Sequence, residues 1–138
     1  MKSPRHFFAP KAIGAPAPLR EIPVRPSRMI HFFDPSNPRM ASKVPDIAKQ
    51  VDILLGNLED AIPTERKVDA REGLIKIAKG QSFGDTQLWT RVNSLDSPWM
   101  LDDVTRLVTE IGDKLDVIMI PKVEGPWEIG RASCRERV

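Results

Sequence analysis

The sequence contains 138 residues, of which 41% are apolar and 29% are charged, and this composition is typical of one globular domain. The net charge of +2 is small and dispersed, which argues against a nucleic-acid-binding protein. No apolar run is long enough to span a bilayer and the N-terminus lacks the apolar segment of a secretion signal, so we expect a cytoplasmic protein without a membrane partner. With Cys134 as the single cysteine and only two histidines, any metal should be a hard cation bound by oxygen.

Residues 1–27 hold six of the thirteen prolines and show no sustained period, so we predict an irregular N-terminal arm. Such an arm packs across the domain or a neighbouring subunit, or else is a passive tail. Residues 28–33 form a compact β-prone segment. The turn that follows, DPSNP, is expected to open a helix with Asn37 as the N-cap and Pro38 at the first helical position.

Two basic residues, Arg39 and Lys43, lie four apart on this predicted helix, near its positive end. Because this spacing places them on one face, they are candidates for holding a phosphate group. The alternative is that they belong to a solvated helix face.

The most informative stretch is an apolar segment that runs directly into acids. Residues 51–58, VDILLGNL, are typical of a buried strand in a parallel sheet. Glu59 and Asp60 follow at the carboxyl end of this strand, where α/β sheets and barrels place their functional residues. The alternative is that the two acids cap the next helix or face water.

Helices and strands alternate through the rest of the chain. We predict a helix over residues 64–79 ended by Gly80, a strand over 88–92 with Arg91 near its end, a helix from Ser97 to Gly112, and a strand over 115–121 followed by Lys122. The residues expected to face inward are Val68, Leu74, Ile75 and Ala78 in the first of these helices and Met100, Leu101, Val104, Leu107, Val108 and Ile111 in the second.

This alternation with short connections predicts an α/β fold in which helices cover a parallel sheet. A dinucleotide-binding fold would carry a glycine-rich turn after its first strand, whereas residues 34–38 contain no glycine. We therefore favour a (β/α)₈ barrel. A complete barrel needs roughly 250 residues, so the chain is expected to supply the N-terminal half of one.

A barrel would bring Glu59, Asp60, Arg91 and Lys122 to one mouth from three separate strands. Arg91 suits bidentate binding of a carboxylate or an α-keto acid, and the two acids suit Mg²⁺, bound directly or through its waters. A divalent cation beside a bound carbonyl stabilises an enolate, which favours aldol or Claisen carbon–carbon cleavage. The alternative is that Arg91 forms a structural salt bridge with Glu59 or Asp60.

Three runs carry a resemblance to a known family: LLGNLEDAIPTERKVDAR, WTRVNSLDSPW and LDVIMIPKVEG. Over residues 29–127 the sequence resembles the N-terminal half of the HpcH/HpaI aldolase and citrate lyase β-subunit family, nearest to its malyl-CoA and β-methylmalyl-CoA lyase branch. The resemblance implies a TIM barrel that depends on Mg²⁺ or Mn²⁺. It also implies reversible cleavage of a 3-hydroxyacyl-CoA to an acyl-CoA and glyoxylate or a similar oxo acid, by a homo-oligomer that is commonly a trimer or hexamer.

The resemblance assigns roles to individual residues. Arg91 matches the arginine that binds the oxo-acid end of the substrate, and Glu59 and Asp60 match the catalytic acidic pair beside the metal and its waters. Lys122 matches the lysine that closes the fourth strand motif, and we expect it to bind substrate.

Arg39 and Lys43 fall near the family's contacts to the phosphates of CoA. Two positions depart from the family pattern. The usual aspartate that opens the acidic motif is Asn57 here, which alters the charge at the mouth, and residues 34–36 replace the glycine turn after the first strand.

The family's two direct metal ligands, a Glu and an Asp on later strands, have no counterpart in the chain. Residues 128–138, EIGRASCRERV, resemble the translation of a sequencing adapter, so we expect a non-native tail; the alternative is a native basic tail. Residues 28–127 would then be a partial barrel domain, a fragment of a CoA-ester lyase that is inactive alone. A class II pyruvate aldolase and a non-catalytic half-barrel that binds a partner subunit or an anion remain as alternatives.

Overall fold

The computed structural model describes residues 27–125 and residue 128, so the arm and the tail expected at the two ends lie almost entirely outside the described residues. Within the described part, four strands form one parallel sheet in the order β1-β2-β3-β4. The strands are β1 (Ile30–Phe33), β2 (Ile53–Asn57), β3 (Gln87–Arg91) and β4 (Val117–Met119). The predicted order of strands and helices is therefore confirmed.

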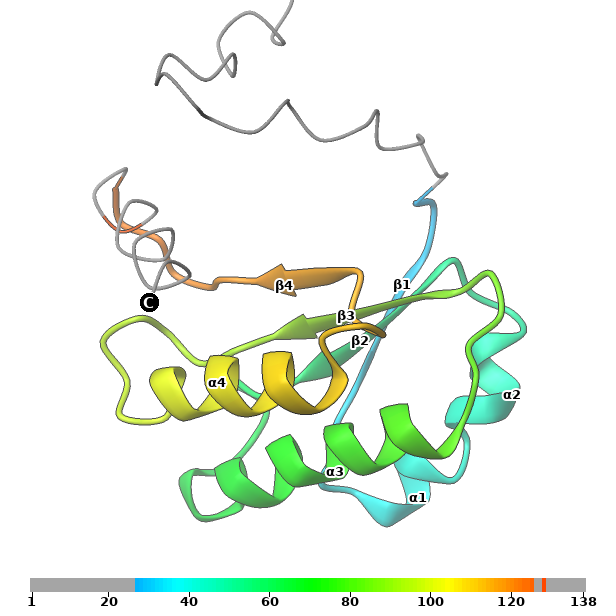
Figure 1. Ribbon diagram of the computed structural model, residues 1–138, viewed down its shortest axis with the longest axis horizontal. Helices are drawn as coiled ribbons and strands as arrows, with labels where there is room; N and C mark the ends of the chain where they lie inside the picture. Colours follow the sequence, from blue (N-terminus) through cyan, green and yellow to red (C-terminus); the bar gives the residue numbers. More distant parts are fainter. Residues whose placement is uncertain (1–26, 126–127, 129–138) are drawn as a thin grey trace, which may run out of the picture.

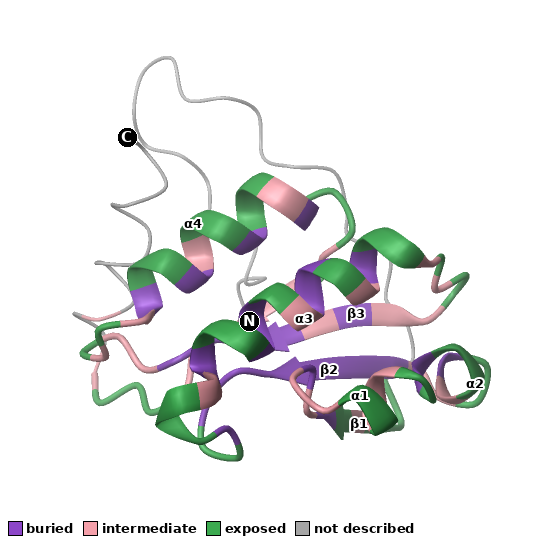
Figure 2. Ribbon diagram, turned by 90° about the horizontal axis from the view of Figure 1, so that it is seen from below, coloured by how far each residue is buried: buried purple, intermediate pink, exposed green. Residues whose placement is uncertain are grey.

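Helices fill each connection between neighbouring strands as far as β4 (Figure 1). The helices α1 (Pro38–Ala41) and α2 (Val44–Ala48) follow β1, a 3₁₀ turn (Thr64–Arg66) and α3 (Lys67–Gly80) follow β2, and α4 (Met100–Ile111) follows β3. The long helices α3 and α4 lie side by side on one face of the sheet (Figure 2).

The main core lies between the sheet and this helical layer. All five residues of β2 are buried, as expected for a strand in the middle of a covered sheet. From β2 and β3, Leu54 and Leu88 pack into one cluster with Leu74 of α3 and Leu107 of α4. Gly56 allows α3 to approach closely, since a Cβ atom there would lie 2.7 Å from Cδ1 of Leu74. Burial of these side chains supplies the main favourable free energy of the fold.

The prediction of inward-facing residues was wrong at three positions. Val68, Leu101 and Val108 are 50%, 56% and 52% exposed. In α3 the inward positions next to Val68 are taken by Lys67 and Arg71, whose charges have buried partners, so the apolar residue lies on the outer side. In α4 the apolar stripe is broader than the face that contacts the core.

The first helix was predicted to be longer than it is. Asn37 is the N-cap, its side chain accepts a hydrogen bond from the backbone N–H of Arg39, and Pro38 takes the first position, as expected. The helix nevertheless ends at Ala41, and Lys43 is the N-cap of α2. Pro45 explains the break, because it lacks the N–H that would bond to the carbonyl of Ala41 and its ring would clash with that carbonyl. Arg39 and Lys43 therefore do not share a helix face.

Candidate functional site

The carboxyl ends of β2 and β3 place polar residues next to one another. Asn57 and Arg91, the last residues of these strands, are register partners, and the N–H of Leu58 donates to the carbonyl of Arg91 at 2.9 Å. Glu59 and Asp60 follow immediately on the β2 side. Because β4 is parallel to β3, the chain that leaves β4 returns to the same edge of the sheet.

Ion pairs join the four predicted site residues into one cluster. Nζ of Lys122 lies 2.7 Å from Oε1 of Glu59 and 2.7 Å from Oδ1 of Asp60. Nη2 of Arg91 lies 3.5 Å from Oε2 of Glu59. The structure thus brings together every residue predicted at the strand ends, and it also contains the Arg91–Glu59 salt bridge that was the competing interpretation.

The cluster has a buried side and an exposed side. The side chain of Glu59 is 5% exposed, whereas those of Asp60 and Lys122 are 62% and 59% exposed. The hydrogen bond from Lys122 lowers the pKa of Asp60, and the bonds to both carboxylates raise the pKa of Lys122. Lys122 has a φ of 52°, an uncommon conformation for a residue with a side chain, which its two ion pairs help to hold.

Asn57 fixes the geometry between Arg91 and Glu59. Its Oδ1 accepts hydrogen bonds from Nε of Arg91 at 2.9 Å and from the backbone N–H of Glu59 at 3.1 Å. The Arg91 guanidinium also lies over the ring of Phe32, 5.7 Å from its centroid. The guanidinium is therefore held by contacts from β1 and β2 in an orientation that does not depend on a ligand.

A buried lysine at the start of α3 was missed by the sequence analysis. Lys67 is 7% exposed and its Nζ donates to the backbone carbonyls of Leu58 at 2.9 Å and Glu59 at 2.7 Å. It lies 5.8 Å from the ring centroid of Trp99, and burial lowers the pKa of the amine. The sequence signal for its burial is its place on the helical stripe of residues 67, 70, 71, 74 and 78. A search for apolar residues at this spacing passes over a charged one.

A second buried polar network lies behind the strand ends. Asp103 of α4 is fully buried; its Oδ1 accepts from Nη1 of Arg71 at 3.1 Å, and its Oδ2 accepts from the N–H and Nδ2 of Asn93 at 3.2 and 2.6 Å. The network ties α3 and α4 to the segment that follows β3. Because that segment continues directly from Arg91, the network also supports the cluster.

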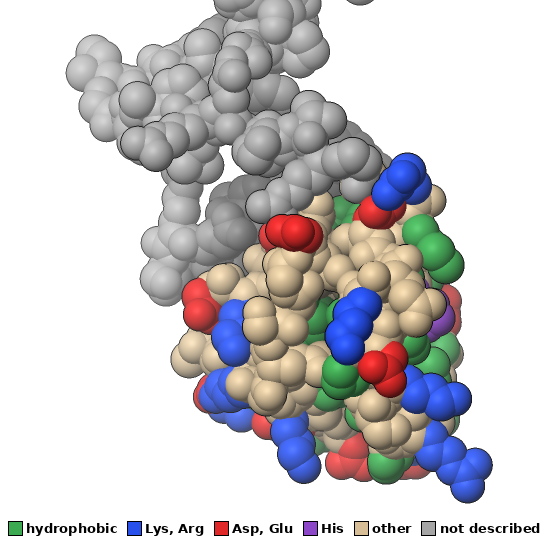
Figure 3. Space-filling model, turned by 90° about the vertical axis from the view of Figure 1, so that its right-hand side faces the viewer, with side chains coloured by type: hydrophobic (Ala, Val, Ile, Leu, Met, Phe, Trp, Pro, Cys, Tyr) green, Lys and Arg blue, Asp and Glu red, His purple; other side chains and the backbone are tan. Residues whose placement is uncertain are grey.

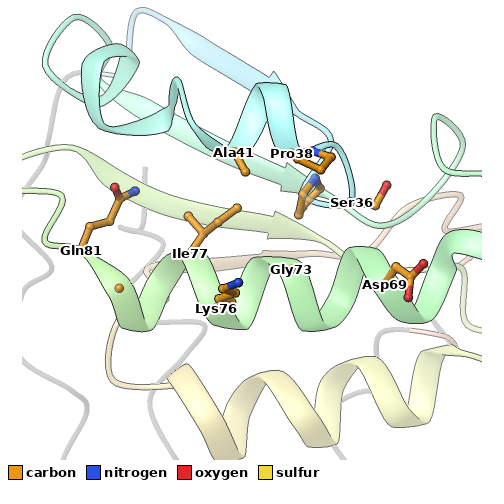
Figure 4. A pocket seen from close by; sticks show the side chains of 10 residues that line it. Ser36, Pro38, Ala41, Asp69, Gly73, Lys76, Ile77 and Gln81 are labelled. Carbon is orange, nitrogen blue, oxygen red and sulfur yellow. The ribbon is translucent and has the colours of Figure 1, made fainter.

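Arg39 and Lys43 lie apart from this cluster. Both are exposed, and neither lines the groove of about 500 Å³ that runs between α1 and α3 (Figure 4). The groove is lined by residues that include Ser36, Asp69, Lys76 and Gln81 and by none of the predicted site residues. On the face shown in Figure 3, Lys and Arg lie interspersed with acids and do not form a continuous basic patch.

Glu59 and Asp60 are better placed to bind the waters around a hard cation than to coordinate the cation directly. Among the described residues, no group of three or more His, Cys, Asp and Glu side chains could hold a metal. Lys122 already occupies one oxygen of Glu59 and one of Asp60, while Oε2 of Glu59 is buried and accepts no hydrogen bond from a described residue. Carboxylates held in this way can bind the waters of Mg²⁺. No helix in the described part is long and apolar enough to cross a membrane.

A model of the family described as HpcH/HpaI aldolase/citrate lyase matches residues 28–134. The chain belongs to this family. It is 58% identical over 128 residues to the malyl-CoA/β-methylmalyl-CoA/citramalyl-CoA lyase of Chloroflexus aurantiacus, and the matched region is 93% of this chain and 37% of the relative. It is 38% identical over 108 residues to an L-malyl-CoA/β-methylmalyl-CoA lyase of Cereibacter sphaeroides, and the matched region is 78% of this chain and 32% of the relative.

Among solved structures, the chain is similar to the protein CitE of Mycobacterium tuberculosis, which was crystallised in complex with magnesium and acetate. The TM-score is 0.58 at 18% identity, over 74% of this chain and 39% of CitE. This likeness supports the fold alone. With the family match and the parallel sheet, it confirms the α/β fold expected for the N-terminal half of a (β/α)₈ barrel. The chain spans about a third of the length of the relatives it matches.

Proposed function

We propose that this chain forms part of a metal-dependent carbon–carbon lyase. The enzyme would cleave a 3-hydroxyacyl-CoA similar to malyl-CoA into an acyl-CoA and glyoxylate or a similar oxo acid. The observation that carries the proposal is the cluster of Arg91, Glu59, Asp60 and Lys122 at the carboxyl edge of a parallel sheet, in a chain of this family.

Arg91 would bind the carboxylate that becomes part of the oxo acid. Its Nε is bonded to Asn57 and its Nη2 faces Glu59, so the guanidinium is oriented before a substrate arrives. A pre-oriented guanidinium binds a planar carboxylate at low entropic cost. In the cleavage the 3-hydroxyl loses its proton, the bond between C2 and C3 breaks, and its electron pair forms the enolate of the acyl-CoA, which is then protonated at C2.

Mg²⁺ or Mn²⁺, when bound, would stabilise the negative charge that develops on oxygen during this step. Glu59 and Asp60 would bind its waters, and Lys122 would keep their carboxylates together and contact the substrate. We extend the proposal to contacts of Arg39 and Lys43 with the phosphates of CoA, because both are exposed and neither forms an ion pair with another described residue. We also propose that the full-length enzyme is cytoplasmic and forms a homotrimer or a homohexamer.

The test is an assay of the full-length gene product and of the 138-residue chain with malyl-CoA, with and without EDTA. We expect the full-length protein to release acyl-CoA and glyoxylate only with the divalent cation, and the 138-residue chain to be inactive because both edge strands of its described sheet lack a neighbour. Arg91→Ala should lower kcat/KM by about 30- to 4,000-fold, the equivalent of roughly 2–5 kcal/mol for a charged contact. Arg91→Lys should mainly raise KM for the oxo acid in the reverse reaction.

Three results would contradict the proposal: no cleavage of CoA esters by the full-length protein, cleavage unaffected by Arg91→Ala, or turnover that persists in EDTA. Release of pyruvate and an aldehyde from a substrate without CoA would instead support the class II aldolase. Size-exclusion chromatography with light scattering tests the trimer or hexamer.

A further inference from the structure

The backbone of Glu59 is held on both sides by side chains from other positions. Its N–H donates to Oδ1 of Asn57 at 3.1 Å, and its carbonyl accepts from Nζ of Lys67 at 2.7 Å. The same Nζ donates to the carbonyl of Leu58 at 2.9 Å. Both peptide groups that flank the Glu59 side chain are therefore fixed where the chain leaves β2.

The carboxylate of Glu59 has little freedom beyond what this backbone allows. The side chain is 5% exposed and reaches Lys122 with one oxygen and Arg91 with the other. The contact with Lys122 is 2.7 Å long, that with Arg91 is 3.5 Å long, and the two come from different segments of the chain, so a small shift of the Glu59 backbone would lengthen at least one of them. The position of the carboxylate relative to Arg91 thus depends on the contacts that hold the backbone.

Lys67 is an uncommon choice for the place it occupies. It is 7% exposed, at the first position of α3, with its ammonium close to Trp99. Burying an ammonium group is costly, and an apolar side chain of similar length would fill the same space without that cost. What the lysine adds is a donor that reaches two carbonyl oxygens at the end of β2.

We propose that Lys67 is a positioning residue that, together with Asn57, fixes the backbone of Glu59 and so sets the place of its carboxylate beside Arg91. The inference rests on the proposed lyase function. Lys67 itself would touch neither substrate nor cation, because its amine is directed at backbone carbonyls.

The test compares Lys67→Met with Lys76→Met in the full-length protein. Lys76 lies on the same helix, is exposed and borders the groove of Figure 4, so it controls for the loss of one lysine from α3. Lys67→Met should lower kcat for malyl-CoA cleavage by about 10- to 100-fold, as misplaced supporting residues do. KM for the oxo acid, measured in the reverse reaction, should change less than kcat, because Arg91 keeps its hydrogen bond to Asn57. Lys67→Arg should recover part of kcat, and Lys76→Met should leave it unchanged.

A second readout does not require activity. Hydrogen exchange followed by mass spectrometry should show faster exchange, by about 10-fold or more, in a peptide that covers residues 58–63 of Lys67→Met, while the β2 peptide keeps its protection. The thermal midpoint, measured in parallel, identifies a variant that is unfolded, in which case Lys67→Gln, whose shorter amide cannot reach both carbonyls, takes its place in both measurements.

The outcomes separate the two claims. Absence of lyase activity in the unsubstituted protein would overturn the proposed function, whereas the exchange at residues 58–63 would still decide whether Lys67 holds this segment. An active enzyme in which Lys67→Met behaves like Lys76→Met would overturn the inference alone. Equal losses of protection throughout the chain would also overturn it, since they would show a general contribution to stability.

Discussion

Two glycines of α3 should respond in opposite directions to the same substitution. An alanine at position 73 would place its Cβ 2.3 Å from the carbonyl oxygen of Pro35, closer than real Cβ atoms approach, whereas an alanine at position 80 would meet nothing within 4 Å. The obstacle at Gly73 is backbone, which cannot rotate away as a side chain can. Gly80 is the last residue of the helix and its φ is not in the left-handed region, so alanine is sterically allowed there.

The magnitudes follow from two competing effects. Alanine is favoured over glycine inside a helix by roughly 0.5–1 kcal/mol, and this term applies to both positions. At Gly73 the helix and the Pro35 turn must also move apart, and overpacking of this kind typically costs about 1–3 kcal/mol. Gly73→Ala should therefore lower the free energy of unfolding by about 1 kcal/mol, with an upper bound of roughly 2.5 kcal/mol, and Gly80→Ala should raise it by up to about 1 kcal/mol.

Equilibrium urea unfolding monitored by far-ultraviolet circular dichroism measures both values. A fair comparison requires equal m-values, because a changed m-value would signal a change in the unfolded state or in cooperativity. The reasoning is refuted if Gly73→Ala unfolds at the same urea concentration as the unsubstituted protein or at a higher one.

Three further predictions use the same unfolding assay. Asp103→Ala should cost about 3–5 kcal/mol, because it removes the buried carboxylate that accepts from Arg71 and leaves that buried guanidinium only a 3.8 Å ion pair with Glu72. A cost below about 1 kcal/mol would contradict the buried network. Leu107→Ala should cost about 2–5 kcal/mol whereas Val108→Ala should stay within about 0.5 kcal/mol, since only the first side chain is buried; similar costs would contradict the assigned face of α4. Hydrogen bonds from the side chain of Arg28 lower the pKa of Asp52 in the folded protein. The stabilising contribution of the Asp52 carboxylate is therefore present above its pKa in the unfolded state and is lost as the pH falls through its pKa in the folded state. Asp52→Asn should flatten this acid limb of a stability–pH curve, and an unchanged limb would contradict the prediction.

The layered arrangement could be predicted because its signals are local. The apolar run of β2 predicted a covered strand, and Asn37 with Pro38 predicted a helix start. The faces of α3 and α4 were predicted less well, because the prediction counted apolar residues only. Lys67 and Arg71 take inward positions on α3 through partners that lie far away in the sequence, and no local pattern reveals such partners.

The candidate site, too, could be predicted in its general position but not in its individual contacts. Parallel strands end at a common edge, so the proximity of Glu59, Asp60, Arg91 and Lys122 followed from topology. Which atoms meet did not follow: a single lysine bridges both acids, and this depends on the path of the chain after β4. The shared face predicted for Arg39 and Lys43 was wrong because the effect of a proline six residues after Arg39 was underestimated.

The site and the core of α3 form one physical unit. Gly73 sets how closely this helix approaches the Pro35 turn, because a Cβ there would meet a backbone carbonyl, and Gly56 leaves room on β2 for the side chain of Leu74. Lys67 lies at the start of the same helix, and its bond to the carbonyl of Glu59 is 2.7 Å long, so a helix displaced by even 1 Å could not keep it at hydrogen-bonding distance without a new side-chain conformation. Close packing of α3 is therefore a condition for the geometry at the end of β2. Substitutions in the core of this helix should affect the charged cluster as well as the stability of the fold.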